Sequence, residues 1–320
     1  MRNLLKQFLS SKYVLPLTRV ACAGLLLAIG LSFLNSVHPA FDTIANFRVH
    51  MAWVCAAAFI FWLLLKNFNN AAIMLFVGIA SAGSSVSGIY NPFNKESAEA
   101  PNTYSLIHYN VKYNNTQRNK VLEMLLREDP DIFTGVEINN LWSDAVYRLS
   151  KKYAHVFHCP EWGSRGGGYI FSKFPFTNKQ PYCHEFAALG VQEVMIEGLP
   201  VSIGAAHLRW PWPASQPEQL IALTPYLNTL EPDALIAGDF NAATWTHAMK
   251  TFAKQGELEI VSGVGGTWTF DGWLSFLAPV FGLPIDNVLH KGRVKILSAK
   301  TLKTNGSDHL PIKVVFSIQK

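Results

Sequence analysis

The sequence contains little charge and little cysteine. Of its 320 residues, 15% are charged and 49% are hydrophobic, whereas soluble domains carry about 25% charged residues. A disordered chain combines low hydrophobicity with high net charge, so this composition excludes one. Four cysteines are too few to hold a chain of this length together as a disulfide-rich scaffold. Apolar packing must therefore supply the core, and the length suffices for one sizeable core and an additional segment.

The apolar excess lies near the N-terminus, in three runs at about 14–34, 47–65 and 71–90. A transmembrane helix needs about 20 mostly apolar residues, a length that the first two runs meet well and the third meets marginally. For the third run, a buried helix of a soluble core stays an alternative. A cleaved signal peptide does not fit the first run, which is long and is followed by a second run after a short loop. We expect residues 1–90 to form a membrane anchor with three transmembrane helices.

The basic residues beside these runs predict the orientation of the anchor. Four lie on the side of the N-terminus and two on the opposite side: Arg2, Lys6, Lys12 and Lys66 against Arg48 and Lys95. This excess favours a multi-pass protein of the bacterial inner membrane with a cytoplasmic N-terminus. Three spans would then place the rest of the chain in the periplasm, whereas two spans would leave it in the cytoplasm.

Residues 91–102 (NPFNKESAEAPN) are polar, contain two prolines and predict a linker. From 103 to 320, short apolar runs alternate with helical patterns, which is typical of a single α/β domain. The expected strands are 104–111, 131–138, 168–174, 191–196, 201–208, 234–240, 285–290 and 312–318, with helices at 118–127 and 216–230. Residues 1–100 hold seven of the 27 basic and three of the 22 acidic residues, which leaves 20 and 19 for the remainder. Nucleic-acid-binding domains are usually basic, so this near-neutral portion makes a nucleic-acid partner unfavoured, although not excluded.

Polar side chains with catalytic potential collect at the ends of these strands. They are Asn110, Glu137, His207, Asp239 with Asn241, Asp286, and Asp308 with His309. Carboxylate and amide oxygens suit a hard cation such as Mg²⁺, and a histidine beside a carboxylate supplies an oriented acid or base. Each residue alone has an ordinary explanation, because a lone Glu is usually a surface residue and an Asp-His turn is often a capping contact. Six such positions in order along one chain indicate an active site.

Their order, together with three motifs, resembles the endonuclease/exonuclease/phosphatase superfamily over roughly residues 104–317. The motifs are GDFN at 238–241, GSDHLP at 306–311, and RGGG at 165–168 followed by IFSKFP at 170–175. The resemblance implies a four-layer α/β sandwich, in which two mixed β-sheets pack face to face with helices outside. It also implies a metal-dependent hydrolase of phosphate esters.

The resemblance assigns roles residue by residue. Asn110, Glu137 and Asp308 would hold Mg²⁺ or Mn²⁺. Asp239 would activate the attacking water, Asn241 would bond a phosphate oxygen, Asp286 would orient the essential His309, and His207 would face the phosphoryl group. Val136, Ala206 and Asn287 depart from the common family residues Gln, Thr, and His or Tyr. Since all three lie beside the assigned residues, they bear on substrate and rate more than on reaction type.

Two aromatic clusters, at 207–213 and 267–277, follow or precede these positions. Tryptophan near a bilayer surface fits contact with lipid headgroups, while packing of loops against the sandwich explains it equally well. Candidate substrate contacts are Arg165, Arg209, Trp210 and Trp268. We expect a membrane-anchored phosphodiesterase or phosphatase acting on a lipid-linked or small phosphorylated substrate. The alternatives are a membrane-anchored nuclease and a membrane protein that only binds phosphorylated ligands, although Asp239 and His309 together argue against the latter.

The cysteines allow one disulfide bond, whose formation depends on the compartment. Cys22 and Cys55 lie in the apolar runs, whereas Cys159 and Cys183 flank a predicted strand. An oxidising compartment would allow a disulfide between the latter two, provided that their Cα atoms lie within about 7 Å.

Overall fold

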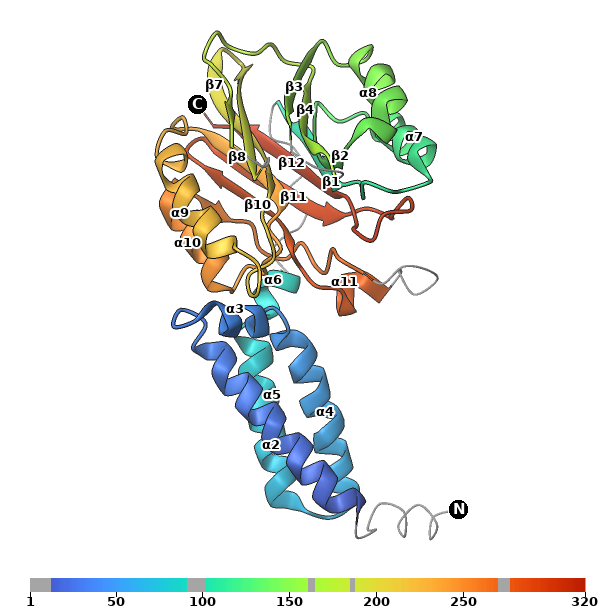
Figure 1. Ribbon diagram of the computed structural model, residues 1–320, viewed down its shortest axis with the longest axis vertical. Coiled ribbons are helices and arrows are strands. Elements are labelled where there is room, and N and C mark those ends of the chain that lie inside the picture. The colour runs from blue at the N-terminus through green and yellow to red at the C-terminus, as the bar shows by residue number, and fades with distance from the viewer. Residues whose placement is uncertain (1–12, 91–101, 161–164, 185–187, 270–276, 320) are drawn as a thin grey trace. The chain divides into compact units, whose positions relative to one another are not determined.

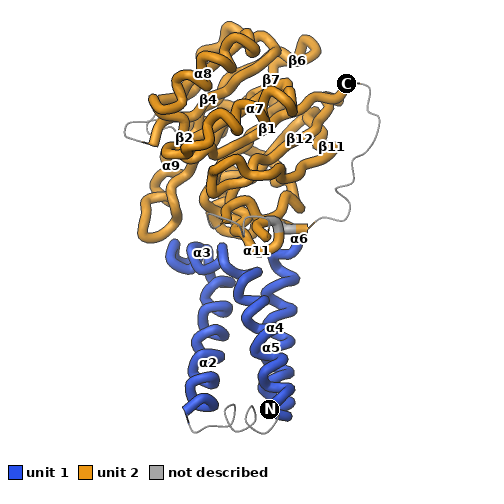
Figure 2. Tube along the Cα trace, turned by 90° about the vertical axis from the view of Figure 1, so that its right-hand side faces the viewer, with its two compact units in different colours: residues 1–87 blue, residues 88–320 orange. Residues whose placement is uncertain are grey.

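The computed structural model describes residues 13–90, 102–160, 165–184, 188–269 and 277–319 (Figure 1). The chain divides into two compact units, Met1–Ser87 and Gly88–Lys320 (Figure 2). Most of the expected linker, residues 91–101, and the centre of the second aromatic cluster, residues 270–276, lie outside the described residues.

Unit 1 is helical. It consists of α2 (Val14–Phe33), α3 (Pro39–Ala45), α4 (Arg48–Leu64) and α5 (Phe68–Gly83), and α6 (Val86–Ile89) follows at its boundary. Of the single helices in the described residues, α2 is the one whose length and composition would let it cross a membrane, as an anchor or as a signal sequence. Helices α3 and α4 would do so only as one span bent by 59°, and α5 with 16 residues is shorter than a span. The length criterion therefore supports the first of the three expected spans and not a multi-pass anchor.

Helices α2, α4 and α5 pack around a small apolar core that contains Ile29, Cys55 and Trp62. Gly78 allows α5 to approach α4 closely, because a Cβ at this position would lie 2.9 Å from the Cβ of Cys55. The buried Arg48 is fully engaged. Its Nε donates to Ser32 Oγ (3.1 Å), a second nitrogen donates to the Ser32 carbonyl, and the guanidinium lies 4.4 Å over the Phe33 ring.

Unit 2 contains two six-stranded mixed sheets. The first, sheet A, has the order β11 (Val294–Thr301), β12 (Ile312–Ile318), β1 (Tyr104–Asn110), β2 (Ile132–Ile138), β4 (Gly167–Ser172) and β3 (His155–Cys159). The second, sheet B, has the order β5 (Tyr182–Cys183), β6 (Leu189–Ile196), β7 (Leu199–His207), β8 (Ala234–Asp239), β10 (Asp286–Lys291) and β9 (Glu259–Ile260).

The alternation of side chains along each strand builds the layers. In β1, Leu106 packs into the core between the two sheets, whereas Ile107 packs against helices on the outer face of sheet A. That outer face is covered by α7 (Arg118–Glu128) and α8 (Ser143–Ser150), with the short η1 (Asn140–Trp142) before α8. The outer face of sheet B is covered by α9 (Gln216–Leu227) and α10 (His247–Gly256), and α11 (Ala278–Phe281) precedes β10. These layers confirm the predicted four-layer α/β sandwich (Figure 1).

The directions of the strands bring the carboxyl ends of some strands and the amino ends of others to one edge of the sandwich. In sheet A, β1 is parallel to β2 and antiparallel to β12. In sheet B, β8 is parallel to β7 and antiparallel to β10. The carboxyl ends of β1, β2, β7 and β8 therefore lie beside the amino ends of β10 and β12. Every polar strand end singled out in the sequence belongs to this one edge of the sandwich.

A disulfide joins the two sheets. Cys159 ends β3, the edge strand of sheet A, and Cys183 lies in β5, the edge strand of sheet B. Their Cα atoms are 5.3 Å apart, which meets the distance that the crosslink requires. Cys22 and Cys55 are free.

Candidate active site

Asn110 links the two sheets at the shared edge. It is the last residue of β1, and its side chain is buried and points toward sheet B. Its Nδ2 donates to Asp239 Oδ2 (2.9 Å) in sheet B and lies 3.3 Å from Glu137 Oε1 in sheet A. One amide thus holds two carboxylates on opposite sheets near each other.

Glu137 reaches this point because of a β-bulge. Val136 and Glu137 together lie opposite the single Gly168, since the pairing passes from Gly135 with Tyr169 to Ile138 with Gly167. Glu137 has a φ of 61°, a conformation that costs free energy for a non-glycine residue and is concentrated at functional sites. The bulge redirects the Glu137 side chain toward the neighbouring sheet, and its Oε2 accepts from the Tyr113 amide (3.0 Å).

His309 and Asp286 form a buried, hydrogen-bonded pair. The His309 Nδ1 lies 2.8 Å from Asp286 Oδ2, and its Nε2 lies 3.7 Å from Asp239 Oδ2. Burial alone would lower the pKa of His309, but the carboxylates of Asp286 and Asp239 outweigh it and raise that pKa to about 10. The ring therefore carries a proton at neutral pH, and Asp286 fixes which nitrogen faces Asp239.

The loop that carries His309 is held by Ser307. The Ser307 hydroxyl donates to the carbonyl of Asn110 (2.7 Å) and accepts from the His309 amide (3.1 Å). Because this hydroxyl bonds the end of β1, the position of His309 is tied to the strand that carries Asn110.

Asp239 lies at the centre of the group. In sheet B it pairs with His207 on one side and with Asp286 on the other. Burial raises the pKa of its carboxyl group, against the opposing effect of His309. Its Oδ1 accepts from the Asn241 amide (2.9 Å), while the Asn241 side chain donates to the Leu208 carbonyl (2.8 Å). A carboxyl group with a raised pKa is a better proton acceptor than an ordinary aspartate.

His207 completes the convergence of predicted residues. Its Nε2 lies 3.7 Å from Glu137 Oε1 and 3.9 Å from Asp239 Oδ2, and its side chain is 12% exposed. For Asp308, whose charge helps to raise the pKa of His309, the role of a metal ligand stays a prediction. Its carboxylate is paired with Lys112 (3.8 Å), and in the described part of the chain it makes no hydrogen bond to Asn110 or Glu137.

The donor set fits a divalent cation. Glu137, Asp239 and Asp286 bring three carboxylates to the site, while His309 supplies one positive charge. The remaining excess of negative charge suits a hard cation held by oxygen atoms. The Asn110 Oδ1 accepts from the Lys112 amide (3.1 Å), and the roles of Asn110 and Glu137 as metal ligands stay predictions. Ligand atoms of Asp239, Asp286 and His309 also lie within 4.8 Å of one another. This trio is therefore compatible with a cation as well as with its predicted acid/base role.

His108 belongs to the site, although the sequence pattern did not single it out. It lies two residues before Asn110 in β1 and is fully buried, with its Nδ1 3.0 Å from Thr134 Oγ1. Its Nε2 lies 3.9 Å from Asp286 Oδ1, and neither of these two atoms has a hydrogen-bond partner. Burial lowers the pKa of His108 to about 3, so the ring is neutral and lies behind Asp286.

In the sequence, a histidine in the middle of a strand does not by itself indicate an active-site residue. Only its period-2 relation to Asn110 could have indicated that it faces the same side.

The glycine run before β4 is explained by close packing. Gly166 has a φ of 89°, and a Cβ there would lie 2.4 Å from backbone atoms of Ile138 and Asn139. A Cβ at Gly167 would lie 2.1 Å from the Cys159 carbonyl oxygen. These glycines let the chain pass directly beside the end of β2, next to Glu137. An open pocket of about 560 Å³ adjoins this point and includes Asn139, Gly166 and Tyr169 in its lining.

The residues expected to contact substrate lie near the site but make different contacts. Arg165 is exposed at the start of the glycine run. The guanidinium of Arg209 donates to Ser215, which ties it to the loop before α9. Trp210 is half-buried after β7, and Trp268 forms bridges with Leu283 and His309. Their contacts with substrate remain predictions.

A two-sheet sandwich with a hydrogen-bonded Asp-His pair, a buried aspartate and a glutamate at one edge has the groups that metal-assisted hydrolysis requires. The family model described as Endonuclease/Exonuclease/phosphatase family matches residues 107–309. The chain belongs to this family, and its activity is the metal-dependent hydrolysis of phosphate esters.

Solved structures of similar fold agree with this assignment. They include D. rerio TDP2 humanized by 14 mutations, at 17% identity with a TM-score of 0.54, covering 67% of this chain and 99% of that one. The endonuclease/exonuclease/phosphatase from Beutenbergia cavernae has 16% identity and a TM-score of 0.55, covering 68% and 72%. The protein of the same description from Bacteroides vulgatus has 11% identity and a TM-score of 0.54, covering 68% and 100%. At these identities the likeness concerns the fold alone. No curated protein sequence matches the chain.

Proposed function

We propose that the protein is a membrane-anchored phosphoesterase that uses Mg²⁺ or Mn²⁺ and acts on a lipid-linked or small phosphorylated substrate. The observation that carries the catalytic part is the alignment of Asp286, His309 and Asp239, with separations of 2.8 Å and 3.7 Å. A group that only binds phosphate would gain nothing from a buried carboxyl group of raised pKa beside a charged histidine.

The arrangement suits hydrolysis by water. Asp239 is placed to accept a proton from the attacking water, and the protonated His309 is placed to donate a hydrogen bond to the charged oxygens on phosphorus. His207, next to both Glu137 and Asp239, faces the same space. When bound, the divalent cation compensates charge that develops on the phosphoryl group.

The surface of unit 1 supports a location in the membrane. In α2 the buried residues are Ile29 and Ser32, and the outward positions are apolar, as at Leu17 (71% exposed) and Leu27 (64%). The outward faces of α4 and α5 are equally apolar, with Ile60 at 57% and Phe76 at 74%. Such large exposed apolar surfaces are unfavourable in water, which favours a bilayer around all three helices even though α4 and α5 are short.

The disulfide supports an orientation with unit 2 outside the cytoplasm. Disulfides form and persist in oxidising compartments such as the periplasm, and the Cys159–Cys183 pair is brought together by the fold. The excess of basic residues on the N-terminal side agrees, because an odd number of spans would place unit 2 on the opposite side of an inner membrane.

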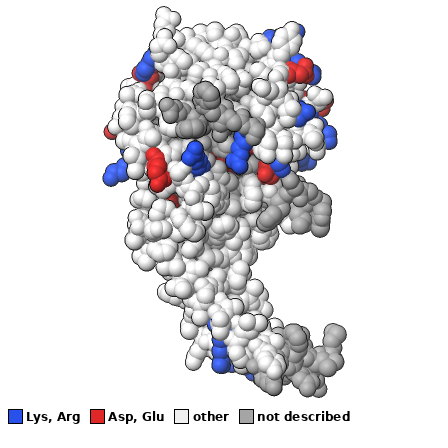
Figure 3. All heavy atoms as spheres, viewed as in Figure 1, with Lys and Arg blue, Asp and Glu red and all other residues white. Residues whose placement is uncertain are grey.

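The distribution of charge favours a small or lipid-linked substrate over nucleic acid. Basic and acidic side chains are interspersed on the face of unit 2 seen in Figure 3, without a continuous basic stripe. A strand of nucleic acid needs several Lys or Arg contacts along its phosphates. Trp212, in the segment after His207, is 51% exposed and suits contact with a lipid headgroup region.

The test uses the full-length protein purified in detergent. We expect Mg²⁺- or Mn²⁺-dependent hydrolysis of bis(p-nitrophenyl) phosphate, which EDTA abolishes and added metal restores. Asp239→Ala and His309→Ala should each lower the rate by at least about 100-fold. His247→Ala, which removes an exposed histidine on α10, serves as the matched control and should leave the rate unchanged.

The same preparation discriminates between substrates. Release of phosphorylated headgroups from membrane lipids, or hydrolysis of small phosphate esters, should exceed degradation of plasmid and single-stranded DNA. Dominant DNA degradation would replace the proposal by a membrane-anchored nuclease. Activity that survives EDTA, or survives both substitutions, would refute the catalytic assignment.

A further inference from the structure

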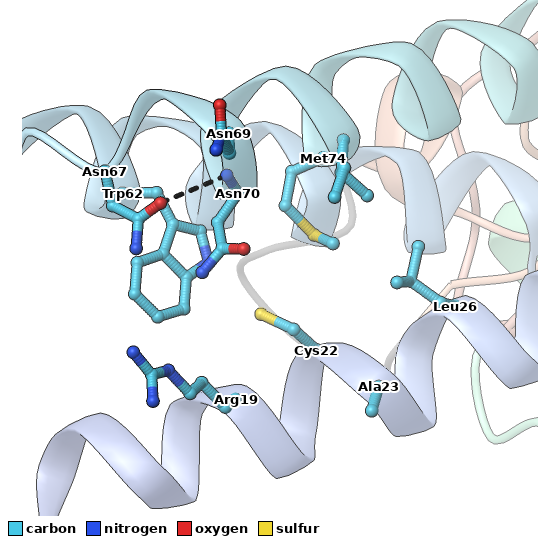
Figure 4. A pocket seen from close by; sticks show the side chains of 10 residues that line it. Arg19, Cys22, Ala23, Leu26, Trp62, Asn67, Asn69, Asn70 and Met74 are labelled. Atoms are coloured by element: carbon cyan, nitrogen blue, oxygen red, sulfur yellow. Dashed lines mark hydrogen bonds between the residues drawn. The ribbon is translucent and has the colours of Figure 1, made fainter.

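Unit 1 contains a polar pocket with no role in the hydrolytic site. It is open, has a volume of about 410 Å³, and lies at the end of the helices where α2 begins and α4 turns into α5. One wall comes from α2, with Arg19 and Cys22, and the other comes from α4, the following turn and α5, with Trp62, Asn67 and Asn70 (Figure 4). Charged and amide groups inside an otherwise apolar helical unit are costly in a bilayer unless a polar partner compensates them.

Among the described residues, two hydrogen-bond donors of this pocket have no protein partner: the exposed Arg19 and the buried Trp62. Trp62 is 1% exposed, yet its indole Nε1 has no hydrogen-bond partner. Arg19 lies in the second turn of α2, and its guanidinium makes no ion pair or hydrogen bond within the described residues. Arg48, in the same unit, by contrast donates two hydrogen bonds to Ser32 and lies over the Phe33 ring. The two unpaired donors point to a ligand with acceptor oxygens.

The start of α5 adds to the positive character of the pocket. Asn67 accepts from the Asn70 amide (3.2 Å) and caps the helix, while Asn69 and Asn70 in its first turn line the pocket. A helix N-terminus carries a partial positive charge and unpaired N–H groups, which favour an anion. The guanidinium of Arg19 forms paired hydrogen bonds with phosphate.

The remaining lining distinguishes a lipid from a free anion. Beyond the polar end, the pocket is bounded by Ala23, Leu26, Ile73 and Met74, a set that an acyl chain would contact and a hydrated ion would avoid. We propose that this pocket binds one anionic phospholipid. Its phosphate lies between Arg19, the Trp62 indole and the start of α5, and an acyl chain lies along the apolar lining. This inference rests on the proposed membrane location and is independent of the hydrolytic activity.

The experiment measures binding of phosphatidylglycerol to the full-length protein in detergent by native mass spectrometry. We expect one tightly bound lipid per chain. Arg19→Gln should weaken binding about tenfold, and Trp62→Phe, which keeps the ring and removes the donor, about threefold. Lys66→Gln is the matched control, because it removes one positive charge between α4 and α5 from a residue that does not line the pocket. It should change the affinity less than twofold.

Each alternative outcome overturns the proposal. Equal weakening by Arg19→Gln and Lys66→Gln would mean general charge attraction and no built site. Equal binding of phosphatidylcholine would refute the preference for an anionic lipid, and displacement by millimolar inorganic phosphate would identify a site for free anions. Absence of the protein from the membrane fraction would refute the membrane location itself, whereas a membrane protein without selective lipid binding would refute only the pocket.

Discussion

Removal of the Cys159–Cys183 disulfide should destabilise unit 2 by an amount that follows from its loop length. The two cysteines are separated by 24 residues, and loss of the chain entropy that a crosslink of this length removes from the unfolded state corresponds to about 3.5 kcal/mol. Unit 2 spans about 230 residues, for which the entropy of unfolding is about 0.5 kcal/mol per degree. The double variant Cys159→Ala/Cys183→Ala should therefore lower the Tm of unit 2 by about 7 °C.

Thermal unfolding of the full-length protein in detergent, followed by scanning fluorimetry with and without reductant, measures this shift. The wild type with reductant should melt near the double variant, whereas reductant should leave the double variant unchanged. A double variant that melts within about 2 °C of the oxidised wild type would refute the reasoning that the crosslink between β3 and β5 constrains the unfolded chain. Free thiols at both positions in protein trapped directly from cells would refute the extracytoplasmic orientation.

Three further changes test the site and the electrostatics of the fold. Asp286→Asn removes the charged partner of His309 Nδ1 and should lower kcat by about 10²- to 10⁴-fold with little change in KM, so a loss confined to KM in steady-state kinetics would contradict the orienting role. Glu137→Gln should raise the Mg²⁺ concentration for half-maximal activity by about 10- to 100-fold, whereas the exposed Glu123→Gln on α7 should leave a metal titration unchanged. Burial alone would raise the pKa of Asp233, but its hydrogen bonds from Arg293 outweigh this and lower that pKa. The Asp233–Arg293 pair therefore stabilises the folded protein when the pH is above the ordinary pKa of an aspartate. This stabilisation is lost as the pH falls through the lowered pKa of Asp233. Asp233→Asn should therefore reduce the Tm by a few degrees at pH 7, and a difference from wild type that does not shrink at all as the pH falls below the ordinary pKa of an aspartate would exclude this cause.

The regular elements with clear periodicity could be predicted from the sequence. The predicted strand 312–318 coincides with β12, and those at 104–111 and 131–138 end within one residue of β1 and β2. The sequence pattern did not predict the strands β3, β5, β9 and β11 or the helices α8, α10 and α11. These elements are short or only weakly apolar on one face, and tertiary packing determines their structure more than local preference. The strand predicted at 201–208 begins two residues too late, because Glu197 and Gly198 form the turn and Pro200 already belongs to β7.

The candidate site was likewise predictable from the sequence only in part. Polar residues at strand ends were visible in the sequence, since a strand's last residue and the turn chemistry after it are local features. The convergence of Asn110, Glu137 and Asp239 required the pairing of two sheets, and the bulge at Glu137 required its partner strand. The pair of Asp308 with Lys112 is likewise a tertiary contact that the motif did not indicate, and its role as a metal ligand stays a prediction.

The sequence alone determined the apolar character of the N-terminal segment, the α/β pattern after it and the family to which the catalytic residues belong. These properties depend on composition, on periods of two and 3.6 residues and on short motifs, all of which are local along the chain. The tertiary structure decided that His108 lies behind Asp286, that Cys159 meets Cys183, and that Arg19 and Trp62 face one pocket. Such contacts join residues far apart in the chain, and only the register of the sheets and the packing of the helices bring them within reach.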